Sequence, residues 1–243
     1  MSAKHSAKLS DGRDLFYFDD AGSALPAARK PDQREPAERP EVAQMRLDSL
    51  TSEWVSVAAH RHSRAFLPPA NQCPLCPTTD ENLSELPDRF DVAVFENKSP
   101  SFGPELLPAV DLDFASVEGL ELGATRKSVG RCEVVVFSPE HLGSLGALPV
   151  ERVKTVIDAL ADRTEHLQSL AGVMQVFPFE NRGQEIGVTL HHPHGQIYAY
   201  PFVTPRTQKL LNSIERFGAD LFAETLEFES ASERVLIRSD SST

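Results

Sequence analysis

Residues 179–196 carry the densest chemistry of the chain, and they read Phe-Glu-Asn-Arg-Gly-Gln-Glu-Ile-Gly-Val-Thr-Leu-His-His-Pro-His-Gly-Gln. Three of the eight histidines of the protein fall within the last six of these residues. Strand-like sequence is interrupted by glycine at three positions, Gly183, Gly187 and Gly195. A glycine lets the backbone approach a ligand closely and present N–H groups to it. The stretch therefore predicts a phosphate-binding loop that leads into a strand.

His192 and His194 are separated by one residue, so their side chains would share a face of an extended chain. A neutral imidazole is a good metal ligand, and it attacks phosphorus without first losing a proton. The two histidines would therefore share one site or divide into a ligand and a nucleophile. The competing interpretation is a pair of incidental loop residues, which the asparagine and the three glycines nearby disfavour.

Outside this stretch, six segments have the β-branched and aromatic composition of strands: 14–19, 54–57, 91–95, 132–137, 173–179 and 196–202. Apolar residues at helical spacing predict one amphipathic helix over 149–170 and a second from Thr204-Pro205 through Phe222. A short strand is predicted over 235–237. Strands outnumber helices and do not alternate with them regularly, which predicts an α+β fold with a mainly antiparallel sheet.

The remaining segments lack such patterns. Residues 20–50 are polar and predict a surface loop or mobile arm, because they bury too little to offset their ordering entropy. Residues 67–90 are rich in proline and predict an irregular loop, and residues 100–120 are loop-like. The length of 243 residues corresponds to about 1.6 domains of ordinary size.

Cys73 and Cys76 form a Cys-x-x-Cys pair. They are two ordinary thiols, a redox pair or half of a zinc site, and a zinc site needs two further ligands. The candidates are His141 and a member of the histidine cluster. The third cysteine, Cys132, lies in an apolar strand and is predicted to be a buried core thiol.

The overall charge excludes some classes of function. Lysine and arginine number 24 against 36 acidic residues, which gives a net charge of −12. Nucleic-acid and membrane-surface binders need basic patches, so neither class is favoured. The longest apolar runs are far shorter than the roughly 20 residues that cross a bilayer. The low cysteine count and the lack of a secretory signal favour a reducing, cytoplasmic location.

Two basic or polar pairs are candidates for anion and nucleotide contacts. Arg61 and Arg64 form either a solvated basic turn or a clamp for phosphate groups. Asn97 and Lys98 follow a predicted strand and could meet a base or ribose, although an ordinary strand end has the same sequence.

Taken together, these residues resemble the galactose-1-phosphate uridylyltransferases of the histidine-triad superfamily. The signature of that family is Phe-Glu-Asn-Arg/Lys-Gly, three residues, Gly, four residues and His-Pro-His-x-Gln, and residues 179–196 match every fixed position. The resemblance extends from about residue 50 to residue 230. It implies a histidine-triad-like, mainly antiparallel half-barrel sheet flanked by helices.

The resemblance also implies roles for individual residues. His194 is the nucleophile that takes the uridylyl group from UDP-glucose and passes it to galactose 1-phosphate. Gln196 stands where triad hydrolases have a third histidine, and it holds phosphoryl oxygens without activating water. The implied substrate-binding residues are Arg61, Arg64, Asn97, Lys98, Asn181, Gly187, Val188, Thr189 and Gln196. The implied ligands of a structural zinc ion are Cys73, Cys76, His141 and His192.

Members of this family continue into a related second half and form homodimers. On the resemblance, residues 1–50 are an N-terminal strand and arm, 51–205 the catalytic domain, and 206–243 a helix and the start of that second half. The glutamate that binds a second metal is replaced near Leu210. One alternative is therefore a zinc-stabilised nucleotide-binding fragment without turnover. A related nucleotidyl phosphorylase or triad hydrolase is the other, which Gln196 and the cysteine pair disfavour.

Overall fold

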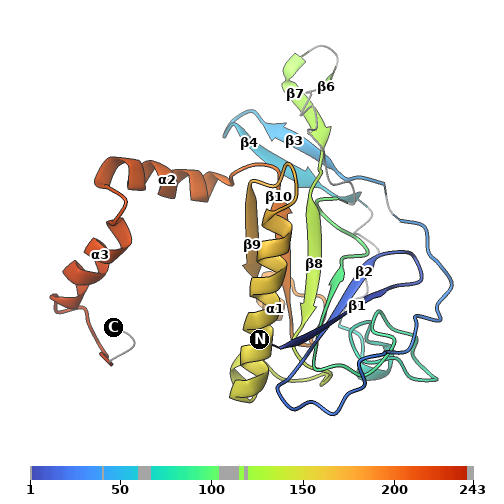
Figure 1. Cartoon of the computed structure of the whole chain (residues 1–243). Coiled ribbons are helices and arrows are strands. Elements are labelled where there is room, and N and C mark those ends of the chain that lie inside the picture. The colour runs from blue at the N-terminus through green and yellow to red at the C-terminus, as the bar shows by residue number, and fades with distance from the viewer. Residues whose placement is uncertain (1, 40, 60–66, 104–114, 118–119, 240–243) are drawn as a thin grey trace. The chain divides into compact units, whose positions relative to one another are not determined.

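The structure is a computed structural model that describes residues 2–39, 41–59, 67–103, 115–117 and 120–239. Contacts divide the chain into two compact units, Met1–Phe202 and Val203–Thr243. The first unit contains two sheets and a long helix, and the second contains two shorter helices (Figure 1). Among the described residues, no helix is both long and apolar enough to cross a membrane.

A six-stranded sheet forms the centre of the first unit, with the strand order β1-β2-β5-β8-β10-β9. Its strands are β1 (Ala3–Lys8), β2 (Asp14–Asp19), β5 (Val92–Glu96), β8 (Arg131–Val136), β10 (His194–Tyr200) and β9 (Gln175–Phe179). Every neighbouring pair is antiparallel. The predicted α+β class with a mainly antiparallel sheet is confirmed.

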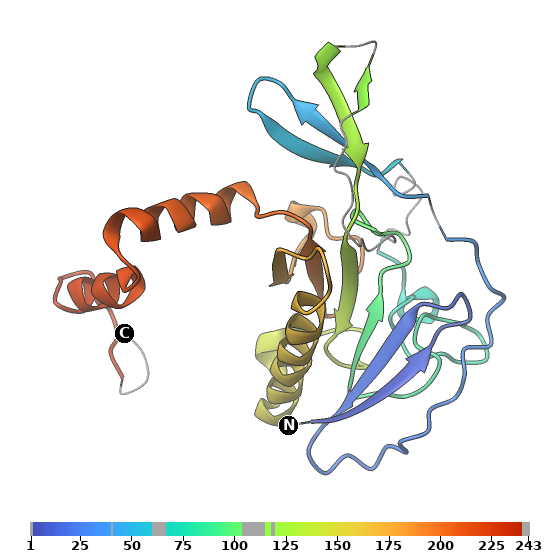
Figure 2. The same cartoon turned by 45° about the horizontal axis from the view of Figure 1, so that its top comes forward.

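Helix α1 (Val150–Gln168) covers one face of this sheet (Figures 1 and 2). Its buried residues Val156 and Leu167 join Val135 and Ile197 of the sheet in one apolar cluster. Burying a Val, Leu or Ile side chain fully is worth about 1.5–3 kcal/mol, so this contact fixes the helix on the sheet. A buried ion pair also joins the helix to the sheet. Arg163 Nε and Nη2 donate to the two carboxylate oxygens of Glu133 over 2.9 and 2.8 Å.

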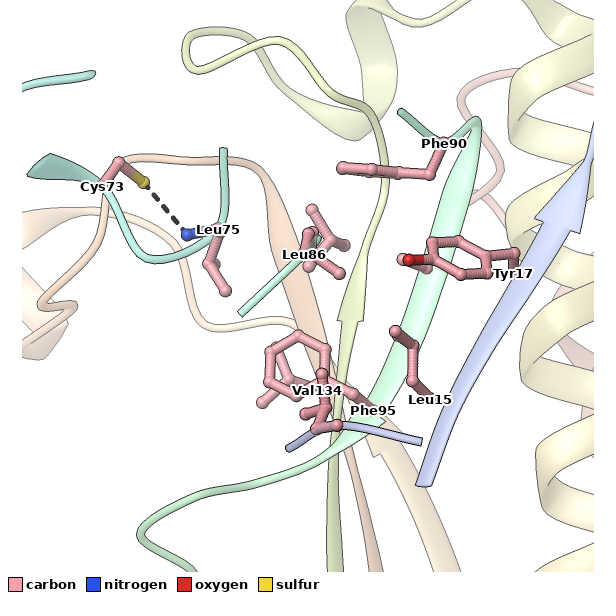
Figure 3. Packing of buried hydrophobic residues seen from close by; sticks show 11 residues of the cluster. Leu15, Tyr17, Cys73, Leu75, Leu86, Phe90, Phe95 and Val134 are labelled. Carbon is pink, nitrogen blue, oxygen red and sulfur yellow. Dashed lines mark hydrogen bonds between the residues drawn. The ribbon is translucent and has the colours of Figure 1, made fainter. Parts of the chain in front are cut away.

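The loop of residues 73–90 covers part of the opposite face. Leu75, Leu86 and Phe90 of this loop pack on sheet residues that include Leu15 and Phe95, and Cys73 lies at the edge of the cluster (Figure 3). The loop is irregular, as predicted, but internal hydrogen bonds such as Glu85 N–H to the Pro74 carbonyl order it. The β10 portion of the same face keeps a row of half-buried side chains at alternate positions, His194, Gln196, Tyr198 and Tyr200.

A second, four-stranded sheet of the first unit has the order β4-β3-β7-β6. Its strands are β4 (Glu53–Val57), β3 (Gln44–Asp48), β7 (Leu120–Lys127) and β6 (Ala115–Val117). Two serines connect this sheet to the segment around Ser101. The hydroxyls of Ser56 and Ser128 both donate to the Ser101 carbonyl, over 2.8 and 2.6 Å. Short 3₁₀ turns occur at Ala70–Gln72, Leu145–Ala147 and Gln184–Ile186.

Several sequence-based expectations were wrong in detail. The loop predicted over 20–50 ends before residue 44, because 44–48 pair with β4. The loop predicted over 100–120 includes β6 and the start of β7. Polar strand β1 has no strand-like pattern and forms because β2 supplies its partner.

The second unit contains α2 (Pro205–Phe217) and α3 (Leu221–Ser230). The single helix predicted through Phe222 is therefore wrong, because Gly218 adopts a φ of 112° and ends α2. The strand predicted over 235–237 is also wrong, since residues 235–238 have no regular structure. Leu236 and Ile237 are 95% and 79% exposed and have no sheet to join.

Candidate active site and metal site

His194 begins β10, where antiparallel pairing with Val136 fixes its place on the sheet. The next residue, Gly195, lies against the neighbouring strand and the core. A Cβ atom there would be 2.9 Å from the Phe137 ring and 3.1 Å from the Phe179 carbonyl oxygen. Real Cβ atoms essentially never approach another atom within 3.0 Å, so only glycine lets β10 lie this close. This close packing fixes the backbone on which His194 sits.

One hydrogen bond defines the tautomer of His194. Its Nδ1 lies 2.7 Å from the His192 carbonyl oxygen, which is only an acceptor. Nδ1 therefore carries the proton, and in the neutral ring the lone pair is on Nε2. A ring held in this way presents one defined nitrogen for reaction.

The glycines of residues 183–187 shape the loop before β10. Gly183 and Gly187 have φ values of 102° and 77°, a region that other residues rarely adopt. They flank the 3₁₀ turn Gln184–Ile186, which Gly187 N–H closes on the Gln184 carbonyl over 2.9 Å. Thr189 is fixed by its carbonyl, which accepts from Leu67 N–H over 2.8 Å. The predicted glycine-dependent loop is thus present beside the histidines.

A cavity of about 250 Å³ lies between this loop and the histidines. Five of the residues singled out from the sequence line it: Asn181, Gly183, Val188, His192 and His194. Gly187 and Thr189 belong to the same loop without lining the cavity. The roles of these residues in substrate binding and catalysis stay predictions.

Gln196 and Asn97 lie on the same face of the sheet as His194. Gln196 is two residues along β10, and its side-chain oxygen accepts from the Tyr198 hydroxyl over 3.3 Å. Asn97 follows β5, and its N–H donates to the Cys132 carbonyl on β8, opposite Tyr198. The Asn97 side-chain oxygen accepts from Ser99 N–H over 2.9 Å, which leaves its NH₂ group as the available donor. Lys98 is exposed beside it.

Two further sequence-based expectations concern an arginine pair and the third cysteine. Arg61 and Arg64 fall outside the described residues. Cys132 is 1% exposed in β8, which confirms the buried thiol.

The cavity also includes residues that sequence reasoning missed. Arg182 and Glu180 line it and belong to the same motif, so their position in the sequence could have found them. Leu142 and Gly143 also line it. Only the fold brings these two to the cavity, and the one available signal was their proximity to His141.

Cys73, Cys76, His141 and His192 come together from three distant segments. Their ligand atoms all lie within 4.8 Å of one another. Cys76 Sγ is 3.5 Å from His141 Nδ1 and 3.4 Å from His192 Nδ1, and Cys73 Sγ is 3.8 Å from His192 Nδ1. Cys73 Sγ also accepts from Leu75 N–H over 3.4 Å (Figure 3). This cluster could bind a metal ion.

Protonation chemistry supports that assignment. His192 Nε2 donates to the Ser138 carbonyl over 2.7 Å, so Nδ1 presents its lone pair to the sulfurs. Burial lowers the pKa of His192 to about 4, which keeps the ring in the neutral, ligating form. Burial and the neighbouring Cys73 raise the pKa of Cys76 to about 12. A cation bound beside Cys76 would therefore be needed to hold that sulfur as a thiolate.

The family model for the N-terminal domain of galactose-1-phosphate uridyl transferase matches residues 32–204. The chain belongs to the galactose-1-phosphate uridylyltransferase family. It is 40% identical to the galactose-1-phosphate uridylyltransferase of Streptomyces lividans, over 98% of this chain and 61% of that protein. It is 34% identical to that of Thermotoga maritima, over 80% of this chain and 59% of that protein. The chain thus spans about 60% of the length of these curated relatives.

Solved structures support the fold of this family member. Two structures, described as a uridylyltransferase and a uridylyltransferase mutant, superpose with TM-scores of 0.59 and 0.61. Both are 24% identical to the chain and cover 81% of it, which corresponds to 59% and 58% of their own chains.

Proposed function

We propose that this chain is a nucleotidyltransferase that exchanges UMP between UDP-glucose and galactose 1-phosphate through a uridylyl-histidine intermediate. The observation that carries the proposal is His194, which lines a glycine-shaped cavity and whose tautomer places a lone pair on Nε2. Family membership supports the substrate class.

The first step is a displacement at phosphorus. Nε2 of His194 attacks the α-phosphorus of UDP-glucose, the bond from that phosphorus to the bridging oxygen breaks, and glucose 1-phosphate leaves. The ring then carries a positive charge, and its Nδ1–H stays hydrogen-bonded to the His192 carbonyl. In the second step, a phosphate oxygen of galactose 1-phosphate attacks the same phosphorus, and the imidazole leaves. Two displacements thus replace one difficult direct transfer.

Polar side chains of the loop hold the transferred phosphoryl group. Asn181 and Arg182 both line the cavity and can donate to phosphoryl oxygens. Gln196 contributes a neutral amide, which accepts no proton from water at neutral pH. The intermediate therefore persists until the sugar phosphate arrives, which favours transfer over hydrolysis.

The metal of the four-ligand cluster is proposed to be zinc. In a tetrahedral zinc site, the bonds are about 2.3 Å to sulfur and 2.0–2.1 Å to nitrogen. Neighbouring ligand atoms then lie about 3.3–3.8 Å apart. The observed sulfur–nitrogen distances of 3.4, 3.5 and 3.8 Å fit this geometry. Four protein ligands close the coordination sphere, so the ion would be structural and would fix His192, whose carbonyl holds His194.

Isotope exchange tests the proposal. The chain is incubated with UDP-glucose and labelled glucose 1-phosphate, without galactose 1-phosphate. A uridylyl-histidine intermediate predicts that label enters UDP-glucose, and His194→Ala abolishes the exchange. An alternative function is the binding of nucleotides without turnover, because the chain spans 61% of the length of the Streptomyces relative. It predicts binding of uridine nucleotides with no exchange, and that result would overturn the catalytic proposal.

A further inference from the structure

Three arginines of the irregular segment 20–39 each reach a carboxylate of the sheet or of the loop 73–90. Arg29 pairs with Asp19 and Arg34 pairs with Glu85, while the last, Arg39, pairs with Glu96. Their spacing of five residues suits an extended chain, in which five residues span about 16 Å. The segment is therefore a strap across the first unit, and its final contact lies one residue before Asn97.

Glu96 is held from three directions. Its two carboxylate oxygens contact Arg39 Nη2 and Arg131 Nη1, the latter over 3.1 Å. Its backbone carbonyl accepts from Arg13 Nη1 over 2.8 Å. Its carboxylate is 5% exposed, so these cations replace almost all of its hydration.

Consecutive residues of a strand point to opposite faces, which separates the anchor from the site. Glu96 is held on the helix-covered face, while Asn97 follows on the face of His194 and Gln196. The Asn97 side-chain oxygen accepts a hydrogen bond from Ser99 N–H, and this contact sets the direction of the NH₂ group on the same amide. A shift of the Glu96 backbone would therefore change the direction of the Asn97 NH₂ group.

We propose that Arg39 is a positioning residue for nucleotide binding, which acts through Glu96 to orient Asn97. This inference rests on the proposed function, because it takes a uridine nucleotide as the ligand of Asn97. It gives the strap a part in binding, although none of the described residues of the strap lines the cavity beside His194.

Calorimetric titration with UDP tests the inference on the whole chain. Arg39→Gln is expected to raise the Kd about fivefold, the scale expected of one partly exposed charged contact. Arg39→Lys keeps the charge and is expected to stay within about twofold of the wild type. Lys4→Gln is the matched control, because Lys4 and Arg39 have similar side-chain exposures of 30% and 32% and each makes an ion pair. Lys4 contacts Asp162 on α1, away from Asn97, so this control should leave the Kd unchanged.

A double-mutant cycle separates positioning from general loosening. In an Asn97→Ala background, Arg39→Gln should have no further effect on the Kd. Equal Kd values for Arg39→Gln and wild type, or an undiminished effect in the Asn97→Ala background, would overturn the inference. A wild-type chain that binds no UDP would contradict the proposed function itself, and this inference with it.

Discussion

Gly195→Ala is the substitution whose effect on the free energy of unfolding follows most directly from the structure. The added Cβ would lie 2.9 and 3.2 Å from two atoms of the Phe137 ring and 3.1 Å from the Phe179 carbonyl oxygen. Phe137 is 3% exposed in the core, and Phe179 belongs to the neighbouring strand, so neither moves freely. Overpacking of this kind costs about 1–3 kcal/mol. Alanine also reduces the entropy of the unfolded chain, which returns about 0.4–1 kcal/mol. The expected net loss is therefore up to about 2.6 kcal/mol relative to the wild type, and about 1–3 kcal/mol relative to a Gly→Ala change that meets no other atom.

Urea denaturation of the variant and the wild type measures this loss. Gly146→Ala is the matched control, because a Cβ at Gly146 has no atom within 4 Å. The control should be as stable as the wild type or slightly more stable. Gly195 lies between His194 and Gln196. The variant should therefore lose exchange activity even at urea concentrations and temperatures where it stays folded. Equal stability of Gly195→Ala and Gly146→Ala would refute the close packing of β10.

Three further predictions concern buried charges and the cysteine–histidine cluster. Glu133→Ala should cost about 3–5 kcal/mol in urea denaturation because it removes the bidentate partner of the buried Arg163 and leaves only Asp162, at 3.9 Å. Glu133→Leu with Arg163→Met should cost less than the sum of the single changes. Burial alone would raise the pKa of Asp32, but hydrogen bonds from Arg34 and from backbone N–H groups lower it to about 2. The stability that this carboxylate contributes is therefore full above about pH 4 and declines toward pH 2, so Asp32→Asn should cost about 1 kcal/mol at pH 7 and less at pH 3. Elemental analysis should find about one zinc per wild-type chain and far less in Cys76→Ser; a metal-free wild type would contradict the four-ligand site.

The sequence predicted the parts of the fold and site that depend on local pattern. The motif of residues 179–196 was enough to predict a glycine-shaped loop and a strand, and the structure shows both. The cysteine pair alone left three interpretations open. Folding brings His141 and His192 to it across 65 and 116 residues, and the resulting cluster could bind a metal ion.

Other features depend on contacts that no local pattern encodes. Strand β1 reads Ala-Lys-His-Ser-Ala-Lys, and only pairing with β2 makes it a strand. The polar composition of 20–43 predicted a loop but not its arginine contacts, because their acidic partners are scattered along the chain. Leu142 lines the cavity, and its neighbour in sequence, His141, belongs to the cysteine–histidine cluster.

Covalent labelling tests the central claim most directly. The chain is incubated with UDP-glucose labelled at the α-phosphate, and label is measured on the denatured protein. We predict acid-labile label on His194, absent in His194→Ala and retained in His166→Ala, a change at the exposed end of α1. Labelling of His194→Ala at the wild-type level would contradict the role of His194 as the nucleophile.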